Sequence, residues 1–331
     1  MTRIRIGISG WRYPPWRAVF YPKGLAQRRE LEYASRMLPS IEINGSFYSL
    51  QRPGCYAEWH DATPSGFVFS VKGPRYITHM LRLNRIEAPL ANFFASGVFE
   101  LRGKLGPLLW QFPPNMQFDP ARFDAFFSLL PRDMQAAQAL ARRHDDKVEG
   151  RTSLGIDANR RLRHAVEIRH ESFRDEAFIA LLRKHRIALV VADTAGKWPL
   201  LEDVTADFMY LRLHGDQELY ASGYSDEALD RWADRIRAWS AGAQPDDARL
   251  ASERRPPSRT QRDVYCYFDN DMKVRAPFDA AQLIRKLGMP CGSPVYPGLP
   301  AGSTGTSATH VSHQQSRTAE HAPAPRTPTR R

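Results

Sequence analysis

Residues that can move protons stand at the ends of several short β-rich runs in this sequence. Glutamate and aspartate carboxylates act as general acids or bases, and an imidazole exchanges a proton near neutral pH. A set of such groups gathered in one place would serve general acid/base catalysis. The candidate catalytic residues are Glu42, Glu167, Asp193 and His214.

Cationic and amide side chains end the same runs, and they suit the recognition of a negatively charged substrate. Arginine and lysine hold carboxylates and phosphates, and they stabilise charge that develops in a transition state. We therefore expect a small anionic or phosphorylated substrate, held by cations while a carboxylate moves its proton. The candidate substrate-binding residues are Asn44, Lys72, His79, Gln111, Arg169, Arg212, Asp269 and Asn270.

The β-rich runs alternate with longer amphipathic runs, and this alternation predicts how the polar residues are brought together. About eight β-then-α units in one chain is the number found in a (β/α)8 barrel of the TIM type. An open doubly wound sheet is the second choice, but the Gly-rich turn typical of that fold is absent after the first strand. The predicted strands are 3–9, 40–44, 67–72, 107–112, 164–169, 187–193, 208–214 and 263–270, and the predicted helices are 27–37, 53–61, 87–102, 119–129, 175–185, 225–239 and 276–287.

The spacing of the polar residues predicts where in the barrel they lie. Side chains of a strand alternate between its two faces, so Glu42 and Asn44 share one face, as do Glu167 and Arg169. In a closed barrel that face points inward at the carboxyl ends of the strands, where barrel active sites are found. The sequence therefore predicts a site at this mouth.

Two alternatives to an acid/base site stay open. Any one of these residues alone is better explained as a structural ion-pair partner. The whole set favours a functional site, because burying many ionisable groups costs several kcal/mol each and such groups would not be retained without a function. The carboxylates with His214 could instead bind Mg²⁺, Mn²⁺ or Zn²⁺, although the nearby cations and the lack of a compact ligand motif argue against a metal. No cofactor is predicted, and a divalent metal remains an alternative.

Length and composition bound the domain organisation. The 331 residues are 42% hydrophobic and 25% charged, which excludes collagen-like, coiled-coil and disulfide-scaffold proteins. We expect one barrel domain over 1–290, with polar insertions near 132–163 and 241–262, and a disordered basic tail over 291–331. Three unpaired cysteines and the absence of a signal peptide or an apolar span predict a cytoplasmic protein without a membrane partner. The sequence does not predict an oligomeric state.

The sequence carries a set of short motifs along residues 4–288. They are Ile6 to Trp11 with Tyr13 and Trp16, Phe20-Tyr21-Pro22, Glu42-Ile43-Asn44 with Phe47-Tyr48, Trp59, Thr63-Pro64, Phe67 to Lys72, Thr78-His79, Gln111 to Pro114, Glu167 to His170, Arg212 to Gly215 and Tyr267 to Asp271. In this combination the chain resembles one family, called domain of unknown function 72 or YecE-like. The resemblance implies a TIM barrel and no assigned biochemical activity. The chain departs from the family pattern at Asp269-Asn270, where Asn-Asn is usual, at Phe173, where Trp is usual, and near Asp279, where Asn is usual.

Three functions are compatible with these residues. The first is an enzyme acting on the anionic substrate by carboxylate acid/base catalysis, with hydrolase, lyase and isomerase chemistry not separated. The second is a nucleic-acid binding or processing protein, with or without a metal. It is suggested by the formal net charge of +11 and by the aromatic residues of the loop after the first strand, which could stack on bases: Trp11, Tyr13, Trp16, Phe20 and Tyr21. The third is a non-catalytic ligand-binding barrel.

Overall fold

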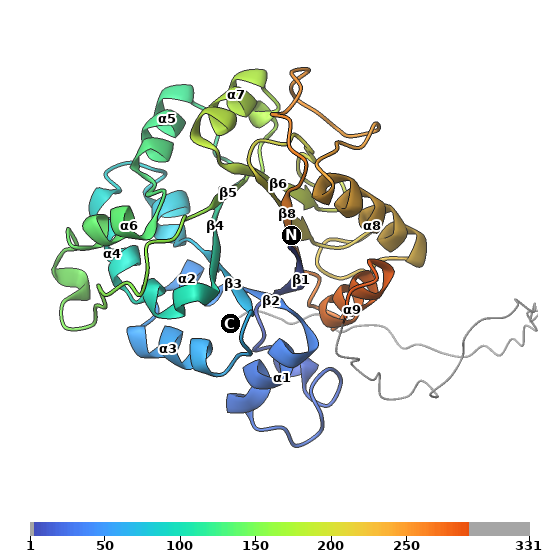
Figure 1. The fold of residues 1–331 in the computed structure, drawn as a ribbon, viewed down its shortest axis with the longest axis horizontal. Coiled ribbons are helices and arrows are strands. Elements are labelled where there is room, and N and C mark those ends of the chain that lie inside the picture. Colours follow the sequence, from blue (N-terminus) through green and yellow to red (C-terminus); the bar gives the residue numbers. More distant parts are fainter. Residues whose placement is uncertain (1–2, 291–331) are drawn as a thin grey trace, which may run out of the picture. The chain divides into compact units, whose positions relative to one another are not determined.

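The computed structural model describes residues 3–290, and these contain a closed barrel of eight parallel strands ringed by helices (Figure 1). Each strand pairs with the next along the chain, and β8 closes the barrel against β1. The predicted (β/α)8 fold is confirmed. The predicted tail over 291–331 lies outside the described residues.

The strands begin close to their predicted starts, and several end one or two residues earlier. The residue after a strand still joins its neighbour: the Asp269 amide donates to the Leu213 carbonyl at 2.8 Å. The polar residues at the strand ends therefore keep the inward and outward alternation of the sheet. The strands are β1 (Ile4–Ser9), β2 (Ser40–Ile43), β3 (Val68–Lys72), β4 (Leu105–Gln111), β5 (His164–Glu167), β6 (Ala188–Asp193), β7 (Phe208–Leu213) and β8 (Asp263–Phe268).

Capping side chains fix the starts of several outer helices. Asp119 accepts a hydrogen bond from the Arg122 amide at the start of α5, and Ser225 does the same for the Ala228 amide at the start of α8. The helices are α1 (Glu30–Met37), α2 (Gly45–Tyr48), α3 (Pro53–Asp61), α4 (Glu87–Ala95), α5 (Pro120–Leu129), α6 (Met134–Ala141), α7 (Glu176–His185), α8 (Asp226–Ser240) and α9 (Ala276–Lys286). Short 3-10 turns are Pro14–Trp16, Gln27–Arg29, Val98–Lys104, Asp146–Val148 and Glu171–Phe173, and Tyr76–Met80 forms a π-helical turn.

The helix predicted over 87–102 is wrong in its second half. The α-helix α4 ends at Ala95, and Gly97 has a φ of 108°, a conformation that glycine adopts without strain. A side chain at this position would also lie 2.4 Å from the Cα of Pro53. The chain turns here to bring the 3-10 segment Val98–Lys104 against α3, and the continuous helix is lost.

Two hydrophobic layers fill the described barrel. The larger one lies between the strands and the helices, and a smaller one fills the barrel interior below the mouth. The interior layer includes Tyr210 and Tyr267, whose hydroxyls bond to Ser70 at 2.6 Å and Ser40 at 2.8 Å. These tyrosines separate an apolar lower barrel from a charged upper one.

Both segments expected as polar insertions contribute to packing. The first contains α6, which contacts α4, and the second supplies backbone amides to two buried carboxylates. The amide of Arg249 donates to Glu202 at 2.9 Å, and that of Ala251 donates to Asp203 at 2.8 Å. The segment 241–262 is therefore held by hydrogen bonds.

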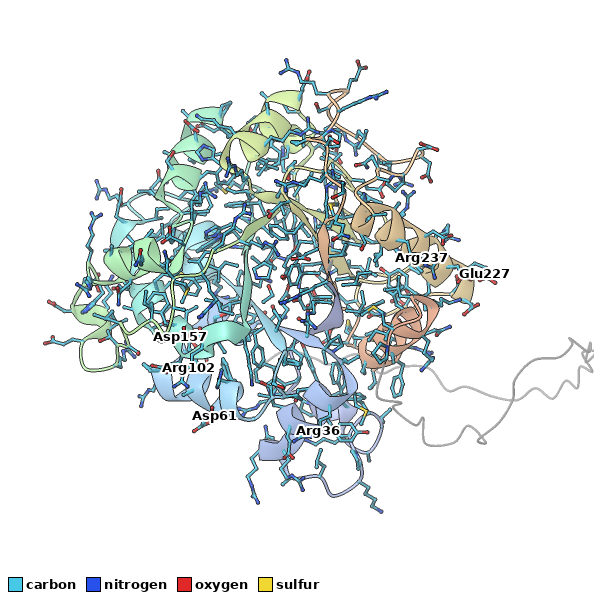
Figure 2. The ribbon with its side chains drawn as sticks, in the orientation of Figure 1. Arg36, Asp61, Arg102, Asp157, Glu227 and Arg237 are labelled. Carbon is cyan, nitrogen blue, oxygen red and sulfur yellow. The ribbon has the colours of Figure 1, made fainter. Side chains whose placement is uncertain are left out.

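Charged side chains project outward from the helices that surround the barrel, as the labelled Arg36, Glu227 and Arg237 show (Figure 2). Among residues 3–290, no helix combines the length and the apolar character needed to cross a bilayer.

The close approach of β1 and β2 gives a stability prediction. A Cβ on Gly7 would lie 2.0 Å from the Ser40 carbonyl oxygen, a backbone atom that cannot move aside. We expect Gly7→Ala to lower the free energy of unfolding by about 3 kcal/mol, measured by urea denaturation. The control, Gly54→Ala in α3, meets no atom within 4 Å and should be neutral or slightly stabilising. Equal midpoints for the two variants would contradict the close packing.

Candidate functional site

The guanidinium of Arg212 on β7 lies inside the upper barrel and is surrounded by carboxylates from three other strands or strand ends. Its nitrogens lie 2.9 Å from Glu42, 2.7 Å from Glu167 and 2.8 Å from Asp269. Its side chain is 1% exposed. We call Arg212, Glu42, Glu167 and Asp269 the charged floor of the mouth.

Both oxygens of Glu42 are occupied within this floor. One accepts from the Ser9 hydroxyl at 2.9 Å, and the other accepts from the Tyr210 hydroxyl at 2.6 Å, in addition to the bonds from Arg212. A carboxylate with both oxygens bonded and no exposed surface has little room to contact a substrate. Glu42 is therefore an anchor for Arg212.

Glu167 is held in the same way from the other side of the barrel. It accepts from Gln111 at 2.8 Å and from Arg169 at 2.9 Å, as well as from Arg212. Burial alone would raise the pKa of Glu167, but Arg169 and Arg212 hold it well below its usual value. Glu167 is thus a fixed anion.

Asp269 and His214 complete the floor beside β8. Burial opposes the charged form of Asp269, yet the charges of Arg212 and His214 lower its pKa. His214 Nδ1 lies 3.0 Å from Asp269 Oδ2, and its Nε2 lies 3.4 Å from a guanidinium nitrogen of Arg212. The imidazole is completely buried. His214 therefore belongs to the buried charged cluster and does not line the mouth cavity.

A cavity of about 830 Å³ lies above the charged floor. The floor residue Asp269 reaches it directly, and cationic, aromatic and amide side chains form its walls. The lining residues are Tyr13, Asn44, Phe47, Tyr48, Lys72, Arg75, His79, Met80, Gln111, Arg169, Tyr220, Asp269 and Asp271.

Lys72, at the end of β3, is a buried cation of this cavity that has no carboxylate partner among residues 3–290. Its Nζ lies 4.1 Å from the centre of the Phe47 ring, and it forms no hydrogen bond or ion pair with any other described residue. Burial lowers the pKa of Lys72 to about 8, and the charge of Arg212 acts in the same direction. A buried ammonium without a carboxylate partner is available to an anion that enters the cavity.

The cavity wall also contains an imidazole, His79, and a carboxylate, Asp271, whose pKa values are both shifted. Burial, helped by the charge of Lys72, lowers the pKa of His79 to about 4, so this imidazole is neutral at pH 7. Burial and the negative charge of Asp269 raise the pKa of Asp271 to about 6. The pKa of Asp271 therefore lies closer to neutral pH than that of an ordinary aspartate.

Two predicted site residues lie away from the cavity. Asp193 accepts from the Tyr224 hydroxyl at 3.1 Å and lines a different cavity. Asn270 donates to Asp279 at 2.7 Å, because it stands on the opposite face from Asp269. Neither residue lines the mouth cavity, because Asp193 faces the different cavity and Asn270 faces Asp279 on α9.

The metal alternative finds no support in the geometry. Over residues 3–290 no three histidine, cysteine, aspartate or glutamate side chains gather as ligands could. The guanidinium of Arg212 stands between Glu42 and Glu167, where an ion bridging them would have to lie. These carboxylates therefore do not fit a divalent cation.

The combination of this barrel and this sequence decides the family. The family model described as "Protein of unknown function DUF72" matches residues 5–302. The chain belongs to the DUF72 family. Two curated relatives match part of it: UPF0759 protein YecE of Escherichia coli (strain K12), 27% identical over 38% of this chain and 43% of its own, and UPF0759 protein YunF of Bacillus subtilis (strain 168), 31% identical over 34% of this chain and 40% of its own. The matches thus span less than half the length of either relative.

Solved DUF72 structures share the fold. A DUF72 family protein from Thermotoga maritima superposes with a TM-score of 0.64 at 23% identity, covering 86% of this chain and 99% of its own. Another from Enterococcus faecalis gives 0.60 at 16% identity, covering 89% and 99%. At these identities the likeness concerns the fold alone.

Sequence reasoning missed several lining residues of this DUF72 chain. Asp271 follows Asp269 by two positions, the same spacing that singled out Glu42 and Asn44, so that spacing could have found it. Tyr13 belongs to an aromatic loop in which Trp11, Trp16, Phe20 and Tyr21 are buried. Loop residues carry no periodicity, so nothing in the sequence separates Tyr13 from its buried neighbours.

The charged floor gives a second stability prediction for the DUF72 chain. Arg212→Met removes the cation that neutralises the buried Glu42 and Glu167 and the partly buried Asp269. We expect the free energy of unfolding to fall by about 3 to 5 kcal/mol in urea denaturation at pH 7. The control is Arg36→Met, which breaks a 3.3 Å pair with Glu32 at the surface and should leave the midpoint unchanged. A stable Arg212→Met variant would contradict the electrostatic role of this residue.

Proposed function

We propose that this protein is an enzyme that acts on a small anionic or phosphorylated substrate at the C-terminal mouth of its barrel. The observation that carries the proposal is Lys72, held buried and unpaired at the wall of the mouth cavity. Retaining a desolvated ammonium is unfavourable unless a ligand neutralises it.

The cations of the cavity are arranged to receive an anion. The Arg169 guanidinium lies 3.8 Å from the centre of the Trp198 ring and remains bonded to Glu167. Stacking and pairing together hold it in one orientation, which lowers the entropy lost on binding. Arg75 lies over Tyr48 at 5.5 Å and has no carboxylate partner among residues 3–290. Lys72 and Arg75, at and after the end of β3, and Arg169, after β5, thus all place positive charge at the wall of this cavity.

Asp271 is the group we assign to proton transfer. A general acid or base works best when its pKa is near the operating pH, and the pKa of Asp271 is raised to about 6. Glu42 and Glu167 are tied to Arg212 and cannot approach a substrate without breaking the charged floor. The carboxylate chemistry predicted from the sequence is therefore proposed at Asp271.

A turnover follows from these roles. The anionic group of the substrate binds Lys72 and Arg169, and the amides of Asn44 and Gln111 are positioned to orient its polar atoms from the same wall. Asp271, ionised above pH 6, accepts a proton from the bound substrate and returns it to the product or to water. Proton transfer of this kind is shared by hydrolases, lyases and isomerases.

The alternatives are less well supported. The loop aromatics that could stack on nucleic-acid bases, Trp11, Trp16, Phe20 and Tyr21, are buried in the core. An open cavity above the floor also disfavours a barrel whose polar ring is saturated by internal ion pairs. A ligand-binding barrel without turnover differs from an enzyme in that it binds the anion but does not convert it, so binding and kcat are measured separately.

The anion site predicts a pH-dependent affinity. We screen sugar phosphates and di- and tricarboxylates, with the uncharged sugars as references, by isothermal titration calorimetry. Lys72→Met should weaken binding of the best anion at least tenfold while raising the free energy of unfolding by about 2 kcal/mol, because a desolvated charge is removed. In the wild type, affinity should fall as the pH rises through about 8, where Lys72 loses its proton.

The control for this experiment is Lys23→Met, which removes an exposed lysine and should change neither affinity nor stability. Equal affinity of the wild type and Lys72→Met for every anion would rule out the anion site.

The proton-transfer role predicts a separate effect on turnover. Asp271→Asn should reduce kcat about 100-fold or more for any compound of the panel that the wild type converts. Its affinity for that compound should change little, and the rise in rate around pH 6 should disappear. The matched control Asp61→Asn alters an exposed carboxylate and should retain full kcat. Tight binding without conversion of any anion would favour the non-catalytic barrel.

A further inference from the structure

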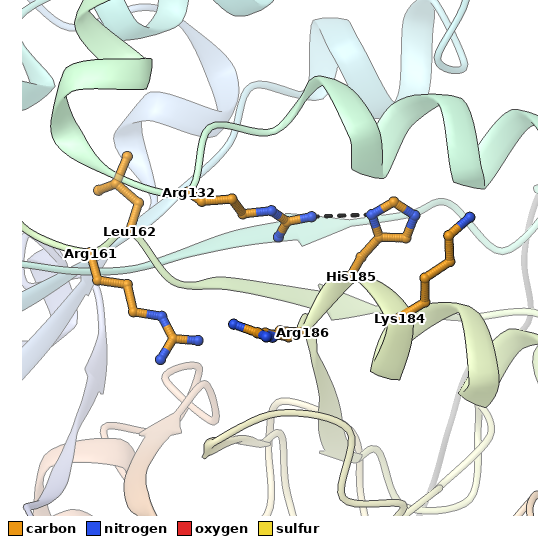
Figure 3. A pocket seen from close by; sticks show the side chains of 6 residues that line it. All are labelled: Arg132, Arg161, Leu162, Lys184, His185 and Arg186. Carbon is orange, nitrogen blue, oxygen red and sulfur yellow. Dashed lines mark hydrogen bonds between the residues drawn. The ribbon is translucent and has the colours of Figure 1, made fainter.

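A second cavity, of about 310 Å³, lies at the other end of the barrel, where the strands begin and the helices end. Figure 3 shows its side chains, which come from three segments distant in sequence. One follows α5, one precedes β5, and one ends α7. The lining residues are Arg132, Arg161, Leu162, Lys184, His185 and Arg186.

The charges around this cavity are incompletely balanced. Lys184 and His185 share one carboxylate oxygen of Asp124, at 2.8 and 2.5 Å. Arg161 pairs with Asp207 at 2.6 Å, but Asp207 also lies 3.4 Å from a second arginine, Arg163. The nearby carboxylates are thus already shared between cations.

Two guanidinium groups of the cavity have no carboxylate partner among the described residues. Arg132 donates to the Phe127 carbonyl at 3.0 Å and lies 3.3 Å from His185 Nδ1. The side chain of Arg186 makes no hydrogen bond or ion pair with residues 3–290. Figure 3 shows the guanidinium of Arg186 turned toward the space that Arg132 and Arg161 also border.

The pKa of Arg132 reports the repulsion between these cations, and the backbone of Arg186 has an unusual conformation. Burial lowers the pKa of Arg132, and the positive charges of Arg161 and Arg186 lower it further. Arg186 has a φ of 53° at the C-terminus of α7, where glycine or asparagine is the usual residue.

Neutralisation of the helix dipole does not account for the cluster. Cations in the last turn of α7 stabilise its C-terminal end, which explains Lys184 and His185. Arg132 donates to the Phe127 carbonyl in the last turn of α5 and so caps that helix. Arg161 belongs to no helix, so a helix end gives no reason for its approach. An anion placed among the guanidinium groups would relieve their repulsion.

We propose that this cavity binds the phosphate or diphosphate group of a small molecule, at a site separate from the mouth. The planar guanidinium matches phosphate oxygens in a bidentate geometry, and several such groups around one concave space select a compact multivalent anion. We call it the basal anion site, formed by Arg132, Arg161 and Arg186.

The probe for the basal anion site is inorganic pyrophosphate, titrated into the full chain by isothermal titration calorimetry. The Lys72→Met background removes the proposed mouth site, so that failure of one site is distinguishable from failure of the other. In this background we expect one remaining pyrophosphate site. Arg186→Asn should weaken it about tenfold or more, since a charge-assisted contact is lost.

Arg186→Asn is suited to the test because its side chain is exposed and unpaired, and asparagine tolerates a positive φ. An unchanged unfolding midpoint shows that the loss of binding is local. Arg132→Gln should weaken binding similarly, and the matched control Arg36→Gln, on α1, should not.

Three results would overturn the proposal. They are the absence of pyrophosphate binding in the Lys72→Met background, binding there that Arg186→Asn and Arg132→Gln leave unchanged, and binding of single-stranded DNA through these arginines when pyrophosphate does not bind. The last result would assign the cavity to a nucleic-acid backbone.

Discussion

The structure depends on one requirement: the guanidinium of Arg212 is buried in the barrel, and a buried charge must be neutralised where it lies. Removing such an ion from water costs several kcal/mol, so carboxylates have to reach it with good geometry. Glu42, Glu167 and Asp269 do so at 2.7 to 2.9 Å. These residues come from β2, β5 and the end of β8, so the electrostatic requirement also fixes how the strands are aligned.

This requirement divides the upper barrel into two parts with different chemistry. Below, charges are matched and the carboxylates are held as acceptors for Arg212. Above, Lys72 and Arg75 lack such partners, and Asp271 lies next to the negative charge of Asp269. The lower part therefore provides a fixed potential, and the upper part provides the groups that remain free to respond to a ligand.

The barrel fold followed from sequence patterns, and so did the inward orientation of several polar side chains at the strand ends. The alternation of runs predicted eight strands, and the two-residue spacing placed Glu42 and Glu167 on the inner face. The same spacing could not tell that Arg212 would occupy their oxygens, because partners on other strands depend on register. Asp193 and Asn270 were expected at the mouth, yet a polar residue ending a strand can face either way, and Tyr224 and Asp279 hold them elsewhere. The turn at Gly97 depends on its close approach to Pro53, a residue distant in sequence, so no local pattern predicts it.

The contacts that Arg212 makes across the barrel also link the charged floor to closure of the barrel. Arg212 and Glu42 are 170 residues apart, and Asp269 arrives later still. The charged floor takes residues from β2, β5, β7 and the end of β8. A chain that lacks any one of these strands therefore leaves at least one of the buried charges without its partner, so the floor is a property of the closed barrel.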